Sequence, residues 1–157
     1  MIYYVEGDIT KSECDFICHQ VNCKGKMGSG VAKTIRAKWP EVYDAYQEKY
    51  IDSVWNKASM LGDIQIVALK DNPKQYVVNF FAQNDYGSDG KRYTSYDAFW
   101  ICLNKLKEVV PKNKRIAFPF KIGCGLGGAD WAVIKTMIER VLEDYTLCFY
   151  NPSGVFN

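Results

Sequence analysis

Two glycine-rich turns in this chain have the composition of anion-binding loops. Gly25 to Ala32 reads Gly-Lys-Met-Gly-Ser-Gly-Val-Ala, follows a strand-like run and leads into helix-like sequence. Ile122 to Trp131 repeats this arrangement later in the chain. Backbone N–H groups at a helix start have no intrahelical partner, and the helix dipole favours negative charge there. The two turns therefore predict that main-chain nitrogens bind phosphate.

Glycine turns between strands and helices also occur in proteins that bind no phosphate and in nucleotide-dependent enzymes. Either turn alone is compatible with ordinary turn chemistry. Gly123 to Gly128 resembles a dinucleotide-binding fingerprint, but that fingerprint belongs to the first βαβ unit and needs an acidic residue further on. Gly25 to Ala32 lacks the Lys-Ser/Thr end of a P-loop. A dehydrogenase, a kinase and an ATPase are therefore not expected.

Two side chains are candidates for direct chemistry. His19 is the single histidine and lies three residues before Asn22, at the end of a predicted strand. It could orient substrate or catalyse, or it could be a core histidine with satisfied hydrogen bonds. Cys124 stands between two glycines, but no histidine or carboxylate lies near it in sequence to activate a thiol. We expect an unreactive Cys124.

The six cysteines and the charge balance exclude several classes of protein. The cysteines lack paired CxxC spacing, which favours reduced, buried thiols over disulfides or a metal site. With 20 basic and 18 acidic side chains, net charge +2, the chain is not expected to bind nucleic acid by counterion release alone. No long apolar run predicts a membrane span and no leader precedes the first strand, so we expect a cytoplasmic monomer.

Strand-like and helix-like runs alternate along the chain. Helices between strands favour an α/β fold with three layers, a central mixed sheet flanked by helices on both faces, in a single domain over residues 1–157. Both glycine turns follow strands, where open α/β sheets bind ligands. The predicted strands are Ile2 to Val5, Asp15 to Val21, Asp63 to Leu69, Gln75 to Phe81, Arg115 to Phe120 and Thr146 to Tyr150. The predicted helices are Val31 to Lys38, Glu41 to Trp55, a helix begun by a Thr94/Asp97 cap, and one begun by Asp130.

Four motifs together resemble a known family. Val5 to Ile9, His19 to Asn22, Met27 to Ala32 and Ile122 to Trp131 occur in the order and spacing of macrodomains, and the resemblance covers nearly the whole chain. The chain looks most like the branch that holds the terminal ADP-ribose glycohydrolases and the fungal-type ADP-ribose-1''-phosphate phosphatases. The resemblance implies that ADP-ribose, free or attached to a substrate, is the partner, that nucleic acid is bound only when ADP-ribosylated, and that no cofactor is needed.

The resemblance also implies roles for individual residues. Asp8 would accept a hydrogen bond from the adenine amino group, the Ile9 N–H would meet a ring nitrogen, and the Tyr150 ring would cover adenine. Asn22 would lie near the distal ribose. Asp8 could instead be a turn or N-cap residue, Asn22 could simply stabilise its loop, and Tyr150 could be a core aromatic. The diphosphate loops would be Met27, Gly28, Ser29, Gly30 and Val31, and Gly123, Cys124, Gly125, Leu126 and Gly127.

The chain departs from the glycohydrolase pattern at two positions. That branch uses a lysine after the strand ending near Phe81 and an aspartate in the second loop, where this chain has Ala82 or Gln83 and Gly127. Neither an amide nor a methyl group can form a Schiff base with the opened ribose, so covalent catalysis by lysine is not expected. The substitutes nearest in sequence, Lys26, Asp85 and Lys91, lie in loops. Hydrolysis by water held by Asn22, His19 and Ser29 is the expected activity, and a non-catalytic ADP-ribose reader is the alternative. The loop from Gln83 to Arg92 is expected to cover the distal ribose.

Overall fold

Six short runs rich in β-branched and aromatic residues form one sheet in the computed structural model, which describes residues 1–157. The strand order across the sheet is β1-β6-β5-β2-β4-β3. Every pair is parallel except β3 with β4, so the predicted mixed sheet is confirmed. The strands are β1 (Ile2–Glu6), β2 (Phe16–Asn22), β3 (Ile64–Ala68), β4 (Tyr76–Gln83), β5 (Arg115–Pro119) and β6 (Thr146–Asn151).

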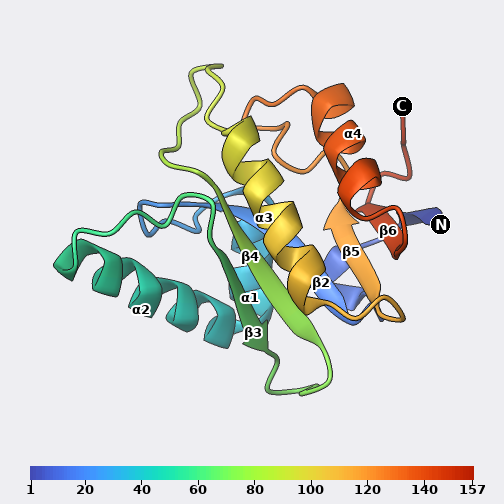
Figure 1. Cartoon of the computed structure of the whole chain (residues 1–157), viewed down its shortest axis with the longest axis horizontal. Helices are drawn as coiled ribbons and strands as arrows, with labels where there is room; N and C mark the ends of the chain where they lie inside the picture. Colours follow the sequence, from blue (N-terminus) through green and yellow to red (C-terminus); the bar gives the residue numbers. More distant parts are fainter.

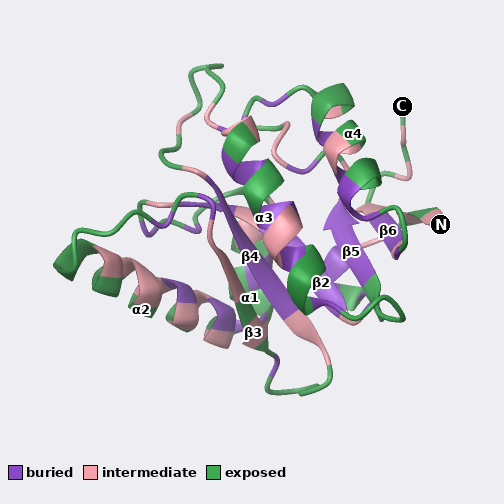
Figure 2. Ribbon diagram, viewed as in Figure 1, coloured by how far each residue is buried: buried purple, intermediate pink, exposed green.

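Helices cover both faces of this sheet, which confirms the predicted three layers (Figure 1). One apolar core joins the sheet to α3 (Tyr96–Val109) and α4 (Trp131–Val141). A second core joins the opposite face to α1 (Gly30–Lys38) and α2 (Pro40–Trp55). The central strands are buried on both faces, whereas each helix turns one stripe inward (Figure 2).

The helix starts follow local capping chemistry, with one correction to the sequence prediction. Asp130 caps α4 by accepting a hydrogen bond from the Ala132 N–H, as predicted. The N-cap of α3 is Ser95, whose hydroxyl accepts from the Ala98 N–H, and not Thr94. Thr94 is buried and directs its hydroxyl to the second glycine loop instead. A long-range contact therefore overrides the local cap pattern at this residue.

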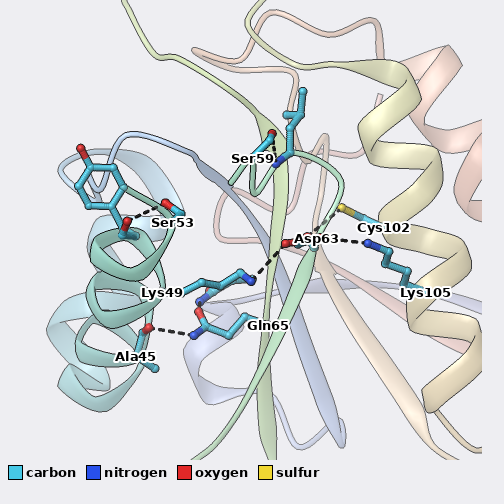
Figure 3. A network of polar contacts seen from close by, with 11 residues as sticks. Ala45, Lys49, Ser53, Ser59, Asp63, Gln65, Cys102 and Lys105 are labelled. Atoms are coloured by element: carbon cyan, nitrogen blue, oxygen red, sulfur yellow. Dashed lines mark hydrogen bonds and ion pairs between the residues drawn. The ribbon is translucent and has the colours of Figure 1, made fainter. Parts of the chain in front are cut away.

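Asp63 links α2 and α3 to the edge of the sheet. Asp63, just before β3, forms ion pairs with Lys49 of α2 at 3.2 Å and with Lys105 of α3 at 3.1 Å (Figure 3). Nearby, the Gln65 side chain of β3 donates to the main-chain oxygen of Ala45 in α2 at 2.8 Å. These contacts fix α2 over the β3 side of the sheet. None of the helices has the length and apolar composition needed to cross a membrane.

Candidate functional site

The parallel strands bring both glycine loops to one edge of the sheet. The first loop, Cys23 to Ser29, follows β2, and the second, Phe120 to Ala129, follows β5. β2 and β5 are parallel neighbours in register from Phe16 and Ile116, so their carboxyl ends point the same way. The loop from Asn84 to Ser95 follows β4 at the same edge. The sequence prediction that the two glycine turns share an edge is therefore confirmed.

The first loop ends in a row of unpartnered main-chain donors. Gly28, Ser29 and Gly30 are exposed, and their N–H groups and that of Val31 make no hydrogen bond within the chain. Ser29 is the N-cap of α1, yet its side chain makes no capping hydrogen bond. The positive end of α1 is thus open to an anion.

Asn22 holds the first loop in this shape. Its Oδ1 accepts from the Lys24 N–H at 3.0 Å and the Lys26 N–H at 3.3 Å, and its Nδ2 donates to the Lys26 oxygen at 2.8 Å. The single hydrogen of the Tyr46 hydroxyl of α2 is shared between the main-chain oxygen and the Oδ1 of Asn22, at 2.7 and 2.8 Å. Only one amide hydrogen of Asn22 is left over, and the residue is buried. This geometry supports loop positioning by Asn22, with one donor free for a ligand.

Met27, also assigned to the first loop, is buried in the core beneath α1 and α2 rather than exposed beside the donors. Its side chain anchors the loop to the α1 and α2 side of the sheet. Its contribution to a bound diphosphate would therefore come from its main chain alone.

The second loop also presents consecutive free donors. The N–H groups of Gly125, Leu126 and Gly127 make no hydrogen bond within the chain, whereas those of Cys124 and Gly128 close turns onto Lys121 and Gly125. Gly123 has φ +77°, a conformation that glycine adopts without strain. Successive free N–H groups in such a turn form a concave anion site.

A buried clamp that the sequence did not predict holds the second loop. The Thr94 hydroxyl donates to the Gly123 oxygen at 2.8 Å and accepts from the Gln20 side chain of β2 at 2.8 Å. The N–H groups of Tyr93 and Thr94 both donate to the Gly127 oxygen at 2.9 Å. The Gln20 amide also donates to the Gln83 side chain at 2.7 Å. No local pattern links Gln20, Gln83 and Thr94, because they come from β2, β4 and the loop before α3.

The clamp explains why Gly127 is a glycine. A Cβ at Gly127 would lie 2.6 Å from both the Gly123 oxygen and the Thr94 Oγ1. Any side chain, including the aspartate of the glycohydrolase pattern, would force these groups apart. Ala82 is buried, and Gln83 is engaged with Gln20 and with the Asp85 oxygen. Ala82, Gln83 and Gly127 therefore supply neither the amine nor the carboxylate that the family pattern has at these positions.

Asp8 and Tyr150 lie at one end of a groove that runs along β1 and β6 to Arg115 and Thr146, the first residues of β5 and β6. The groove has a volume of about 800 Å³ and is lined by both residues. The Asp8 Oδ1 accepts from the N–H and hydroxyl of Thr10, and the backbone bond is the largest cause that lowers the pKa of Asp8. Asp8 therefore does cap the short helix η1 (Ile9–Lys11), while its Oδ2 makes no hydrogen bond within the chain.

The Ile9 N–H and the Tyr150 ring lie at the same end of the site as Asp8. The N–H of Ile9 has no partner within the chain, while its side chain is buried. Tyr150 pairs with Val5 across β1 and β6 and is half-buried, and burial raises the pKa of its phenol. A carboxylate oxygen without a partner, a free N–H and an aromatic ring are thus present on neighbouring segments.

His19 lies in the core on the α1 and α2 side of the sheet. It is 1% exposed, and its Nε2 is hydrogen-bonded to the Asn79 Oδ1 of β4. Asn79 donates in turn to Gln65, whose amide reaches α2. Burial lowers the pKa of His19 to about 4. This buried polar chain supports a structural role for His19 and offers no support for its predicted contact with substrate.

The remaining candidates for chemistry are Cys124 and three charged loop residues. The Cys124 thiol donates to the Ile122 oxygen at 3.4 Å, and burial raises its pKa to about 11, which fits the expected unreactive thiol. Lys26, Asp85 and Lys91 are exposed. All six cysteines are free thiols, and four of them are buried.

The loop after β4 connects the two glycine loops. The Cys23 N–H donates to the Asn84 oxygen at 3.1 Å, which joins this loop to the first glycine loop. At its other end, a Cβ at Gly128 would lie 2.6 Å from the Lys91 oxygen, so the loop packs directly on the second glycine loop. The segment therefore closes the end of the site that lies away from Asp8.

Comparisons with known proteins agree with this geometry. The Macro domain family profile matches residues 18–138. A DNA ADP-ribosyl glycohydrolase of Mycobacterium tuberculosis is 27% identical over 98% of this chain and 43% of its own length. An ADP-ribose 1''-phosphate phosphatase of Scheffersomyces stipitis is 25% identical over 95% of this chain and 97% of its own length. The chain thus spans less than half of the first of these relatives.

The fold is shared with solved structures as well. The macrodomain of Mycobacterium tuberculosis DarG superposes with a TM-score of 0.78 at 24% identity, covering 97% of this chain and 98% of that one. The family profile covers well over half of the chain and includes both glycine loops. With this profile, this architecture and two donor loops at one sheet edge, the chain belongs to the macrodomain family.

Proposed function

We propose that this protein binds ADP-ribose with the diphosphate between its two glycine loops. Two runs of main-chain donors without partners, Gly28 to Val31 and Gly125 to Gly127, lie at the same edge of the sheet, and this observation carries the proposal. Main-chain N–H groups bind a diphosphate by hydrogen bonds and by the helix dipole, without requiring a basic side chain in contact with it. The free Asp8 oxygen, the Ile9 N–H and the Tyr150 ring would then receive adenine at the β1 side.

We further propose that the protein hydrolyses an ADP-ribose derivative at its distal ribose. Relatives along nearly the whole chain are named as hydrolases of two such derivatives. Placing adenine at Asp8 directs the distal ribose toward Asn22 and the loop after β4. The remaining amide hydrogen of Asn22 and the unengaged Ser29 hydroxyl would position the substrate and a water molecule. His19 would act only by supporting the sheet beneath them.

A non-catalytic ADP-ribose reader is the second candidate, favoured by one observation. No free acid or base with a pKa near neutrality stands beside Asn22, because His19 is buried and the pKa of Cys124 is raised to about 11. Binding alone would need only the main-chain donors.

The two candidates are separated by product formation. The protein is incubated with ADP-ribose-1''-phosphate, with O-acetyl-ADP-ribose and with ADP-ribosylated protein or DNA, and release is followed over time. Hydrolysis predicts turnover of at least one substrate, reduced at least about tenfold by Ser29→Ala combined with Asn22→Ala. A protein that binds ADP-ribose but releases nothing from any of them is a reader.

A further inference from the structure

Unpaired positive charge gathers on one segment of this nearly neutral chain. Residues 16–38 contain five basic side chains and no acidic one, whereas the other residues carry 15 basic and 18 acidic side chains, a net charge of −3. All five basic residues are exposed, and none takes part in an ion pair. They are Lys24, Lys26, Lys33, Arg36 and Lys38.

Two of these residues line a pocket between α1 and α2. The pocket has a volume of about 650 Å³, and Lys33, Arg36 and Tyr43 line it together with Gly28 of the first loop. The guanidinium carbon of Arg36 lies 3.7 Å from the centre of the Tyr43 ring. No carboxylate lines this pocket, whereas the groove beside Asp8 also contains Glu6 and Glu13. The pocket therefore combines free cations with an aromatic surface.

The pocket adjoins the first glycine loop, where the diphosphate is proposed to bind. Its lining comes from that loop, from α1 and from the first turn of α2. Gly28 belongs both to the pocket and to the first row of donors. The pocket is therefore continuous with the first row of donors at Gly28.

We propose that the pocket between α1 and α2 binds the strand of a nucleic acid whose ADP-ribose occupies the site. This inference rests on the proposed function and names its substrate class. Lys33 and Arg36 would contact phosphates, and a base would stack against the Arg36 and Tyr43 pair. An acidic peptide would use the cations but would offer no base to stack on the Arg36 and Tyr43 pair.

The test compares two double variants of equal charge change. Lys33→Gln/Arg36→Gln removes both pocket cations, and Lys74→Gln/Lys114→Gln removes two exposed cations that precede β4 and β5 at the opposite sheet edge. Binding of an unmodified single-stranded oligonucleotide is followed by fluorescence anisotropy over a range of salt concentrations. ADP-ribose binding is measured by calorimetry on the same proteins.

The pocket variant is expected to bind the oligonucleotide about tenfold more weakly, with the slope of log K against log salt reduced by about 1.4, since each phosphate contact on a single strand contributes about 0.7. The control variant should stay within about twofold of the original protein. Tyr43→Leu should weaken binding about fivefold without changing the slope, because stacking carries no charge. Affinity for ADP-ribose should be the same in all of these proteins.

Two results would overturn the inference while leaving the proposed function intact. The first is unchanged oligonucleotide affinity in the pocket variant with normal ADP-ribose binding. The second is equal competition by polyglutamate of the same charge, which would make the pocket a general anion surface. If the original protein does not bind ADP-ribose at all, the proposed function fails, and this inference fails with it.

Discussion

The two glycine loops offer the same kind of donor but are held in place differently. The first loop is shaped by Asn22, a residue at its own start, and its donors belong to the beginning of α1. The second loop is clamped by Thr94 and Gln20, which come from other elements. The first loop therefore combines its own hydrogen bonds with contacts from α2, where Tyr46 reaches Asn22 and Gln47 donates to the Gly25 oxygen at 2.6 Å. The second loop depends on contacts from β2 and from the loop before α3. Variants that damage one clamp at a time test this difference.

The largest effect is expected from Gly127→Ala in the second loop. The added Cβ would lie 2.6 Å from two oxygen atoms, so the clamp must open. We expect a loss of about 2–4 kcal/mol in the free energy of unfolding and at least about tenfold weaker ADP-ribose binding. Urea denaturation and calorimetry measure the two quantities.

Gly125→Ala is the matched control for Gly127→Ala. A Cβ at Gly125 meets no atom within 4 Å, and its φ is not positive. This variant should change the free energy of unfolding by less than about 1 kcal/mol. Equal losses in both variants would contradict the assigned role of the clamp.

Asn22→Ala should have the next largest effect, in the first loop. It removes the hydrogen bonds to Lys24 and Lys26 and one of the two bonds from Tyr46. We expect a loss of about 2–3 kcal/mol in the free energy of unfolding, because buried partners are left unsatisfied. Tyr46→Phe keeps the Asn22 amide and should cost less. Thermal and urea unfolding of both variants would reveal a reversed order, which the proposed role of Asn22 does not allow.

Burial of His19 predicts a dependence of stability on pH. The pKa of His19 is about 4 in the folded protein, against 6.5 for an exposed histidine. Below pH 6.5 the unfolded chain binds a proton that the folded protein does not, so stability is full above pH 6.5 and falls toward pH 4. Between about pH 6.5 and about pH 5 the loss should be about 2 kcal/mol.

His19→Gln should remove most of this pH dependence, since the chain has no other histidine. Urea denaturation at about pH 7 and about pH 5 provides the comparison. The same slope in both proteins would show that the burial of His19 does not control it.

Thr94→Val should produce the smallest of these effects. It deletes the hydroxyl that bridges Gln20 and the Gly123 oxygen, but it keeps the Thr94 N–H bond to Gly127. We expect about fivefold weaker ADP-ribose binding, with Thr94→Ser close to the original protein. Calorimetry that finds Thr94→Ser as weak as Thr94→Val would show that the methyl group, not the hydroxyl, matters.

The sequence predicted those structural features that depend on residues close together along the chain. The strands, the starts of α1 and α4 and the position of both glycine turns follow from local composition and spacing. Thr94 was wrong as a cap because its hydroxyl is satisfied by Gly123, a residue far away in sequence. The need for glycine at position 127 comes from the same contact.

Side-chain burial was harder to predict than loop position. His19 and Asn22 stand three residues apart in one strand, and their types alone are compatible with catalysis. The structure engages His19 with Asn79 of the next strand and Asn22 with its own loop. Only the pairing of β2 with β4 decides the first of these contacts.

The most direct test of diphosphate binding by both loops is a titration of the ¹⁵N-labelled protein with ADP-ribose, followed by NMR of the backbone amides. Binding by the two loops predicts saturable shifts at Gly28 to Val31 and at Gly125 to Gly127, the groups without partners in the free chain. Shifts confined to one loop, or none at millimolar ADP-ribose, would contradict the claim that both loops hold the diphosphate.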